Sequence, residues 1–157
     1  MSSSEDRRYG IAHDAAAAVL RSAAQRYWAD FVECGNELPL DEYHSPGTFF
    51  ELRPTRPGGA PIRLHPEDPG EVTVYVDGIP LYLLGVQRMD LGDVQAALED
   101  VVDGVLAGCV VIEIHTRWFR PPFAVIRVTG ASGREYRSRT DPPSSTTTYS
   151  PYEARPI

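Results

Sequence analysis

One stretch, residues 109–130, brings together several side chains that could do chemistry; its sequence is CVVIEIHTRWFRPPFAVIRVTG. Arginine can bind a carboxylate or phosphate through two parallel hydrogen bonds, and histidine can move a proton near neutral pH. The stretch is therefore a candidate anion-binding or acid–base surface. Its charged and titratable side chains are Glu113, His115, Arg117, Arg120 and Arg127.

The same stretch alternates between apolar and polar residues, a pattern that predicts two β-strands joined at Pro121-Pro122. Even-numbered positions are apolar on both sides of the turn, and odd-numbered positions carry most of the polar side chains. A turn centred on Arg120 would pair residues whose numbers sum to about 240. Glu113 would then lie opposite Arg127, and His115 opposite Val125, so we expect one polar and one apolar face.

A third strand is expected at 134–140, after the turn sequence GASG. Tyr136 would join the apolar face, while Arg137 and Arg139 would extend the polar face. A shift of one residue would place both arginines against the core, which favours this register.

Two interpretations of the polar face stay open at this point. It could be a binding surface, or it could be a solvated sheet face whose ion pairs are each worth at most about 1 kcal/mol. The spacing places no second acid, base or nucleophile beside His115, so we assign no catalytic residue.

Aromatic residues add to this candidate surface. Trp118 lies between Arg117 and Arg120 in the turn, and such clusters are frequent among interface hot spots, although Trp118 could instead cover the end of the sheet. Tyr75 and Tyr82 are expected on the polar side of another hairpin, where exposed aromatics indicate a partner, a ligand or a dimer. The candidate binding residues are Tyr75, Tyr82, Glu113, His115, Arg117, Trp118, Arg120, Arg127 and Arg137.

The sequence predicts no metal site and no cofactor. HPED (65–68) and DEYH (41–44) lie in expected loops and lack the helical HExxH spacing. The two cysteines, Cys34 and Cys109, fit neither a disulfide framework nor a metal-binding spacing. All fifteen basic residues are arginine, which excludes lysine nucleophiles and Schiff bases.

Two helices and several strands should position these residues. Apolar residues at helical spacing predict helices over 11–34 and 90–108, the second with an acidic face toward solvent. Asp77-Gly78 suits a two-residue type I′ turn and would set Val74 opposite Leu81. The expected strands before the second helix are 48–54, 62–65, 71–76 and 79–85.

These elements predict an α+β fold. We expect a two-layer sandwich in which a mostly antiparallel sheet of six to seven strands packs against two helices, in the order α-β-β-β-β-α-β-β-β. A flexible tail (1–9), a single domain (10–140) and a disordered Pro/Ser/Thr-rich tail (141–157) complete the expected organisation.

Charge and hydropathy restrict the expected partners. The net charge of −7 argues against general nucleic-acid binding, and no apolar run is long enough to suggest a membrane span or signal peptide. A cytoplasmic protein is therefore expected. The charge is uneven, −10 over residues 1–108 and +3 over 109–157, which favours oriented association with a charged partner.

The function that these features favour is protein interaction without catalysis, with another protein or with a second copy as a homodimer. The element order is similar to that of small bacterial binding proteins, such as secretion chaperones and toxin-neutralising immunity proteins, but architecture alone does not give function. A small-ligand domain or enzyme is the alternative, with a pocket between sheet and helices lined by Tyr82, His115 and Arg127. A structural domain with a signalling tail is the third.

Overall fold

A computed structural model describes residues 3–35, 48–67, 71–81, 91–143 and 148–156 of the chain. Within these ranges it contains two α-helices and eight antiparallel strands, which confirms the expected α+β class. No helix in the described ranges is long and apolar enough to cross a membrane. The elements are α1 (Ser3–Arg26), β1 (Ala29–Cys34), β2 (Phe49–Pro54), β3 (Ile62–Glu67), β4 (Glu71–Val76), β5 (Ile79–Leu81), α2 (Leu91–Leu106), β6 (Val110–Arg117), β7 (Arg120–Thr129) and β8 (Glu135–Thr140).

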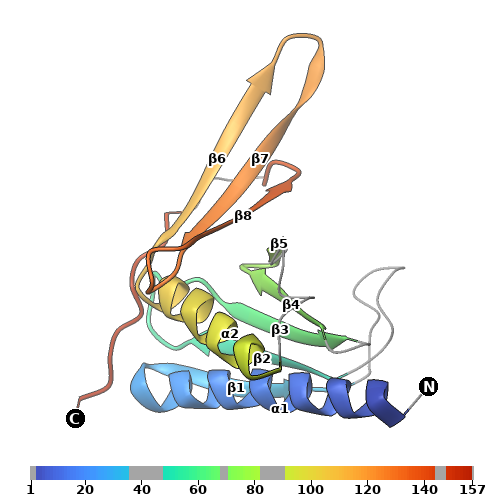
Figure 1. Ribbon diagram of the computed structural model, residues 1–157. Coiled ribbons are helices and arrows are strands. Elements are labelled where there is room, and N and C mark those ends of the chain that lie inside the picture. Colours follow the sequence, from blue (N-terminus) through green and yellow to red (C-terminus); the bar gives the residue numbers. More distant parts are fainter. Residues whose placement is uncertain (1–2, 36–47, 68–70, 82–90, 144–147, 157) are drawn as a thin grey trace.

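The strands form two sheets, not the single sheet of six to seven strands that we expected. Strands β1 to β5 pair in sequence order in one sheet, and β6, β7 and β8 pair in the other. Figure 1 shows α1, α2 and the five-stranded sheet together, with the long β6–β7 pair extending away from them. We call the first group the body and the β6–β7 pair the hairpin.

The core lies between α1 and one face of the five-stranded sheet, and it continues between α2 and the base of the three-stranded sheet. Helix α1 packs against β1 to β4 and against α2. Alternate residues of the strands point toward the helices, so their apolar side chains are removed from water. The fully buried residues of β2 to β5 are Phe50, Leu52, Ile62, Leu64, Val74, Val76 and Leu81, and β7 adds Ala124, Ile126 and Val128.

The helix expected over 11–34 is shorter at its C-terminal end, because the chain turns into β1. Helix α1 ends at Arg26, and β1 pairs antiparallel with β2, which sets Phe31 opposite Leu52. The ring of Phe31 stacks on that of Phe50, with 5.7 Å between the ring centroids. Pairing with a strand distant in sequence therefore overrides the local helical spacing.

Two segments near the chain ends form structure that the sequence did not indicate. Helix α1 begins at Ser3, within the segment predicted as a flexible tail. Residues 148–156, which we expected to be disordered, lie against the body, and we call them the strap (Figure 1). Tyr152 is buried, its hydroxyl donates to the carbonyl of Ala60, and its N–H donates to the carbonyl of Leu106 at 2.8 Å.

Arg155 of the strap caps the C-terminal end of α1. Its Nε donates to the carbonyl oxygens of Tyr27 at 2.8 Å and Ala24 at 3.0 Å. A guanidinium is favourable here because the last carbonyls of a helix lack partners within the helix and carry partial negative charge. The strap thus stabilises the point where α1 gives way to β1.

The β4–β5 turn is confirmed as predicted. Asp77 and Gly78 both have positive φ angles, 51° and 78°, and Val74 lies opposite Leu81. Tyr75 lies on the face of the sheet that points away from the helices. Tyr82, a candidate binding residue, lies outside the described residues.

Candidate interaction surface

Helix α2 holds the three-stranded sheet through Asp100. Its carboxylate accepts hydrogen bonds from the amide of Ser132 at 2.7 Å, the hydroxyl of Ser132 at 2.8 Å and the hydroxyl of Tyr136 at 2.7 Å. We expected the acidic residues of this helix to face solvent. For Asp100 that expectation is wrong, because its carboxylate binds the β7–β8 turn. We call this contact between Asp100 and the turn the joint.

The ionised form of Asp100 is the form that the joint requires. Burial alone would raise the pKa of Asp100, but hydrogen bonds from Tyr136 and Ser132 outweigh it and lower the pKa below its usual value. Burial and the hydrogen bond to Asp100 raise the pKa of Tyr136 to about 12, so its hydroxyl stays protonated and donates.

Two glycines allow α2 and the turn to approach closely. A Cβ on Gly104 would lie 2.3 Å from the carbonyl oxygen of Thr129, and a Cβ on Gly130 would lie 2.3 Å from Oδ2 of Asp100. No larger side chain fits at either position without displacing a neighbour. The joint therefore fixes how the three-stranded sheet leaves the body.

The faces of the hairpin are as predicted, but the pairing is shifted by two residues. Glu113 lies opposite Val125 and His115 opposite Phe123, so paired numbers sum to 238 along most of β6. The turn is Trp118-Phe119 instead of Pro121-Pro122, because Arg117 pairs with Arg120 and Phe119 takes the positive φ of 62°. A shift of two residues leaves every side chain on its predicted face.

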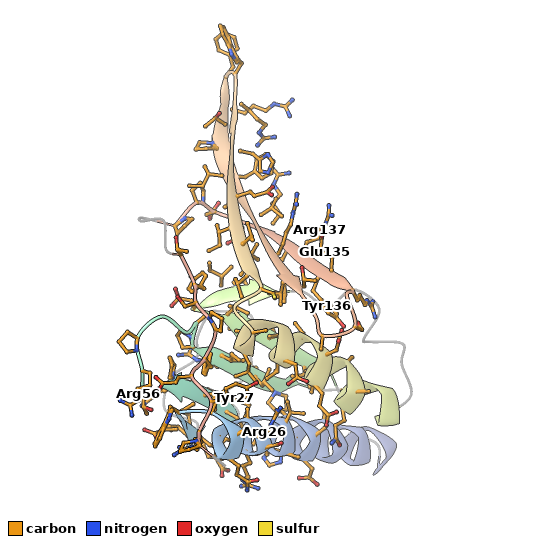
Figure 2. The ribbon with its side chains drawn as sticks, turned by 90° about the vertical axis from the view of Figure 1, so that its left-hand side faces the viewer. Arg26, Tyr27, Arg56, Glu135, Tyr136 and Arg137 are labelled. Atoms are coloured by element: carbon orange, nitrogen blue, oxygen red, sulfur yellow. The ribbon has the colours of Figure 1, made fainter. Side chains whose placement is uncertain are left out.

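Ion pairs connect the polar side chains of the outer face, the face that points away from the body core. Arg127 lies diagonal to Glu113, with 3.0 Å between Nη2 and Oε2, and His115 Nε2 lies 3.4 Å from the same oxygen. Arg137 pairs with Glu135 on β8. Tyr136 lies between these two in the sequence, and Figure 2 shows it lower, next to α2. All of these side chains are partly exposed, so each pair contributes little to folding.

Phe123 is the centre of a cationic cluster near the end of the hairpin. The His115 ring stacks on it at 4.9 Å between centroids, and the guanidinium carbons of Arg117 and Arg139 lie 4.8 and 4.0 Å from its centroid. A hollow of about 420 Å³ lies beside this cluster. It is lined by Pro80, Arg117, Pro121, Pro122, Phe123, Arg139, Thr140 and Asp141.

The end of the hairpin exposes two adjacent aromatic rings. Trp118 is 88% exposed and Phe119 is 96% exposed, with the rings 5.7 Å apart edge to face. Trp118 therefore does not cover the end of the sheet. Val111, 54% exposed, and Ile114, 46% exposed, are the other large exposed apolar residues of the described ranges, and both lie on β6.

The outer face of the body carries a second aromatic group, which includes Tyr75. The His65 ring stacks on Phe49 at 4.6 Å between centroids and lies 4.8 Å from the ring of Tyr75. We expected His65 to end a short strand, 62–65, and to begin a surface loop; it is a buried residue within β3, which continues to Glu67. The alternation of Ile62 and Leu64 with Arg63 and His65 indicated the strand, but not the burial of His65 on its outer face. Tyr75 therefore belongs to a different surface from the hairpin candidates.

The geometry fits binding better than proton transfer. His115 lies on the outer face with its imidazole on Phe123, and neither it nor Arg127 faces a pocket between sheet and helices as the ligand alternative required. Among the residues described, no cluster of histidine, cysteine and carboxylate side chains could hold a metal ion. Comparisons with protein-family profiles, curated proteins and solved structures found no match.

Proposed function

We propose that this protein is a non-enzymatic protein-interaction protein whose binding element is the hairpin. One observation carries the proposal: Trp118 and Phe119 are almost fully exposed, side by side, at the end of a strand pair that extends from the body. Burying a large apolar side chain against a partner gains about 1.5–3 kcal/mol. Adjacent exposed aromatics are therefore a strong driving force for association.

The charges around the aromatics indicate the chemistry of the partner surface. Arg117 and Arg120 flank Trp118 and Phe119, and the outer face carries more arginines than glutamates. A partner would present apolar side chains to the two rings, with the arginines at the rim excluding water from the aromatic contact. Inhibitor-like and chaperone-like roles, and the cytoplasmic location, stay predictions within this proposal.

Site-specific photo-crosslinking in the cells that produce the protein tests the proposal. A benzophenone amino acid replaces Phe119, which is 96% exposed, and in a second strain it replaces Gln25, an exposed residue of α1. We expect one or a few discrete protein adducts from position 119 on irradiation. The same adducts should be lost when Trp118→Ala and Arg120→Ala are added.

Position 25 is the control for random encounter. It should give no discrete adduct, because it lies on the body and away from the hairpin. The absence of any adduct from position 119, or the same adducts from positions 119 and 25, would overturn the proposal.

A second candidate function rests on the hollow beside Phe123. Two guanidinium groups, from Arg117 and Arg139, border it together with the aromatic ring. This combination suits a small aromatic carboxylate or phosphate, whose charge pairs with arginine while its ring packs on Phe123. Titration with benzoate, followed by amide chemical shifts, should perturb Phe123 and its neighbours in the wild type but not in Arg139→Ala. Arg134→Ala, which alters an arginine outside the hollow, is the control.

A further inference from the structure

We infer that the partner of the hairpin is a second copy of this chain, which pairs with it antiparallel along the outer edge of β6. The inference rests on the proposed function and names its partner. In the dimer the two three-stranded sheets join into one sheet, with β6 beside β6 at a twofold axis.

Strand β6 has an edge that is free to pair. In the described part of the chain, β6 is the first strand of its sheet and pairs only with β7. The N–H of Thr129 donates to the carbonyl of Cys109 at 3.0 Å, which makes these two residues a hydrogen-bonded pair. Such pairs alternate along an antiparallel ladder, so the N–H and C=O groups of Ile112 and Ile114 point away from β7.

The edge carries few of the features that usually prevent strand pairing. Edge strands of soluble proteins are protected by charged side chains, especially lysine, by proline, by bulges or by very short length, and β6 has only two charged residues, Glu113 and Arg117. Strand β6 has eight residues, Val110–Arg117, without lysine or proline, and its register shift lies at the far end, between His115 and Arg117. Val111 and Ile114 are both about half exposed, so the strand is also apolar enough to gain from pairing.

Charge and geometry select one register. The outward N–H groups of β6 belong to even-numbered residues, and in a dimer these residues must lie opposite one another. The numbers of two residues that lie opposite each other therefore add up to an even value, and we name each possible register by this sum. A sum of 226 would set Glu113 opposite the second copy's Glu113, which is unfavourable. A sum of 224 would bring the second copy's Trp118 level with residue 106, within α2. A sum of 228 sets Ile114 opposite Ile114 and Glu113 opposite the second copy's His115.

The register with a sum of 228 would cover the apolar residues that are exposed in a single copy. The two Ile114 side chains meet at the axis, and Val111 lies opposite the apolar stem of the second copy's Arg117. The second copy's Trp118 and Phe119 come alongside Val110 and the exposed Cys109, where the hairpin leaves the body. Every large exposed apolar side chain of the described ranges therefore lies in this interface.

Disulfide trapping at the axis tests the register. The native Cys34 and Cys109 are first replaced by serine, and a cysteine is introduced by Ile114→Cys. Directly opposed residues in a hydrogen-bonded pair have Cα atoms about 5.5 Å apart, which fits a disulfide. We expect mild oxidation to convert most of this variant to a covalent dimer. Val111→Cys, an equally exposed change on the same strand, should stay monomeric in a denaturing gel, because its two copies would be about 20 Å apart.

Sedimentation velocity tests the dimer without introduced cysteines. The full chain should sediment as a dimer at tens of micromolar. Ile114→Arg should shift it to the monomer while its circular dichroism spectrum stays unchanged, because two guanidiniums would then meet at the axis. Gln25→Arg adds the same charge on α1 and should stay dimeric.

A wild-type chain that is monomeric at every concentration overturns the inference, and so does a disulfide at position 111 instead of 114. These failures are separable from failure of the proposed function. A monomeric chain whose position 119 still gives a discrete adduct with a different protein keeps the hairpin as binding element and removes the second copy as its partner.

Discussion

The body and β6, the outer strand of the hairpin, follow the same alternation of apolar and polar residues but differ in what covers the apolar face. In β7, the inner strand, Ala124, Ile126 and Val128 are fully buried as in the body. In β2 of the body, Phe50 and Leu52 are fully buried beneath the helices. In β6 of the hairpin, Ile112 is half-buried and Ile114 is 46% exposed, because the strands extend beyond α2. Alternation therefore predicts that a strand has two faces, and it does not predict whether anything packs on them.

The largest expected difference in the free energy of unfolding comes from making the same substitution, Phe to Ala, in both regions. Phe50→Ala removes a fully buried ring and should lower the free energy of unfolding by about 3–5 kcal/mol. Phe119→Ala removes a ring that is 96% exposed and should change it by less than about 0.5 kcal/mol. Denaturant unfolding followed by circular dichroism measures both values. Equal losses would show that the tip of the hairpin is packed in solution.

The close contact at the joint, where α2 meets the β7–β8 turn, should give the next largest effect on stability. Gly104→Ala should destabilise the fold by about 1–3 kcal/mol, because the new methyl group would overlap the carbonyl of Thr129. Gly10→Ala, in α1 with open space around it, is the matched control and should stabilise by about 0.5–1 kcal/mol. If Gly104→Ala also stabilised, α2 and the β7–β8 turn would not be in close contact.

The features that sequence predicts best in this chain depend on neighbours in the sequence. Asp77-Gly78 requires positive φ at both positions, and that requirement alone fixes the turn type and the β4–β5 register. The assignment of Glu113 and Arg127 to one face likewise needs only alternation. The exact pairing in the hairpin was not predictable in the same way, because Phe119 adopts a positive φ that its residue type does not suggest.

The features that sequence missed depend on distant partners. Residues 27–34 continue the helical spacing of α1, and only pairing with β2 makes Ala29–Cys34 a strand. Tyr152 and Arg155 lie in a segment of loop-like composition, and their bonds to Ala60 and Tyr27 join residues far apart in the chain. Asp100 was indistinguishable from other acids of α2 until its contact with Ser132 was known.

The pH dependence of stability should report on the joint. The pKa of Asp100 is lower in the folded than in the unfolded chain, so its contribution is present above the unfolded pKa, about 3.9, and is lost as pH falls through the folded pKa. Asp100→Asn should therefore cost about 1–3 kcal/mol at pH 7, and its difference from wild type should shrink below about pH 4.

The control for this titration is Asp30→Asn, on the exposed side of β1. It should change the free energy of unfolding by less than about 0.5 kcal/mol between pH 7 and pH 3. A difference between Asp100→Asn and wild type that stays constant over the same range would mean that the hydrogen bonds, and not the charge, hold the joint.

The smallest effect on stability separates an arginine of the hairpin from one of the strap, which lies on the body. Arg127→Met removes a half-exposed ion pair with Glu113 and should cost at most about 1 kcal/mol, less in high salt. Arg155→Met removes charged hydrogen bonds to main-chain carbonyls and should cost more, about 1.5–3 kcal/mol. Denaturant unfolding at two salt concentrations compares them. If Arg127→Met cost as much as Arg155→Met, the outer face would be needed for folding, and its charges could not be assigned to a partner.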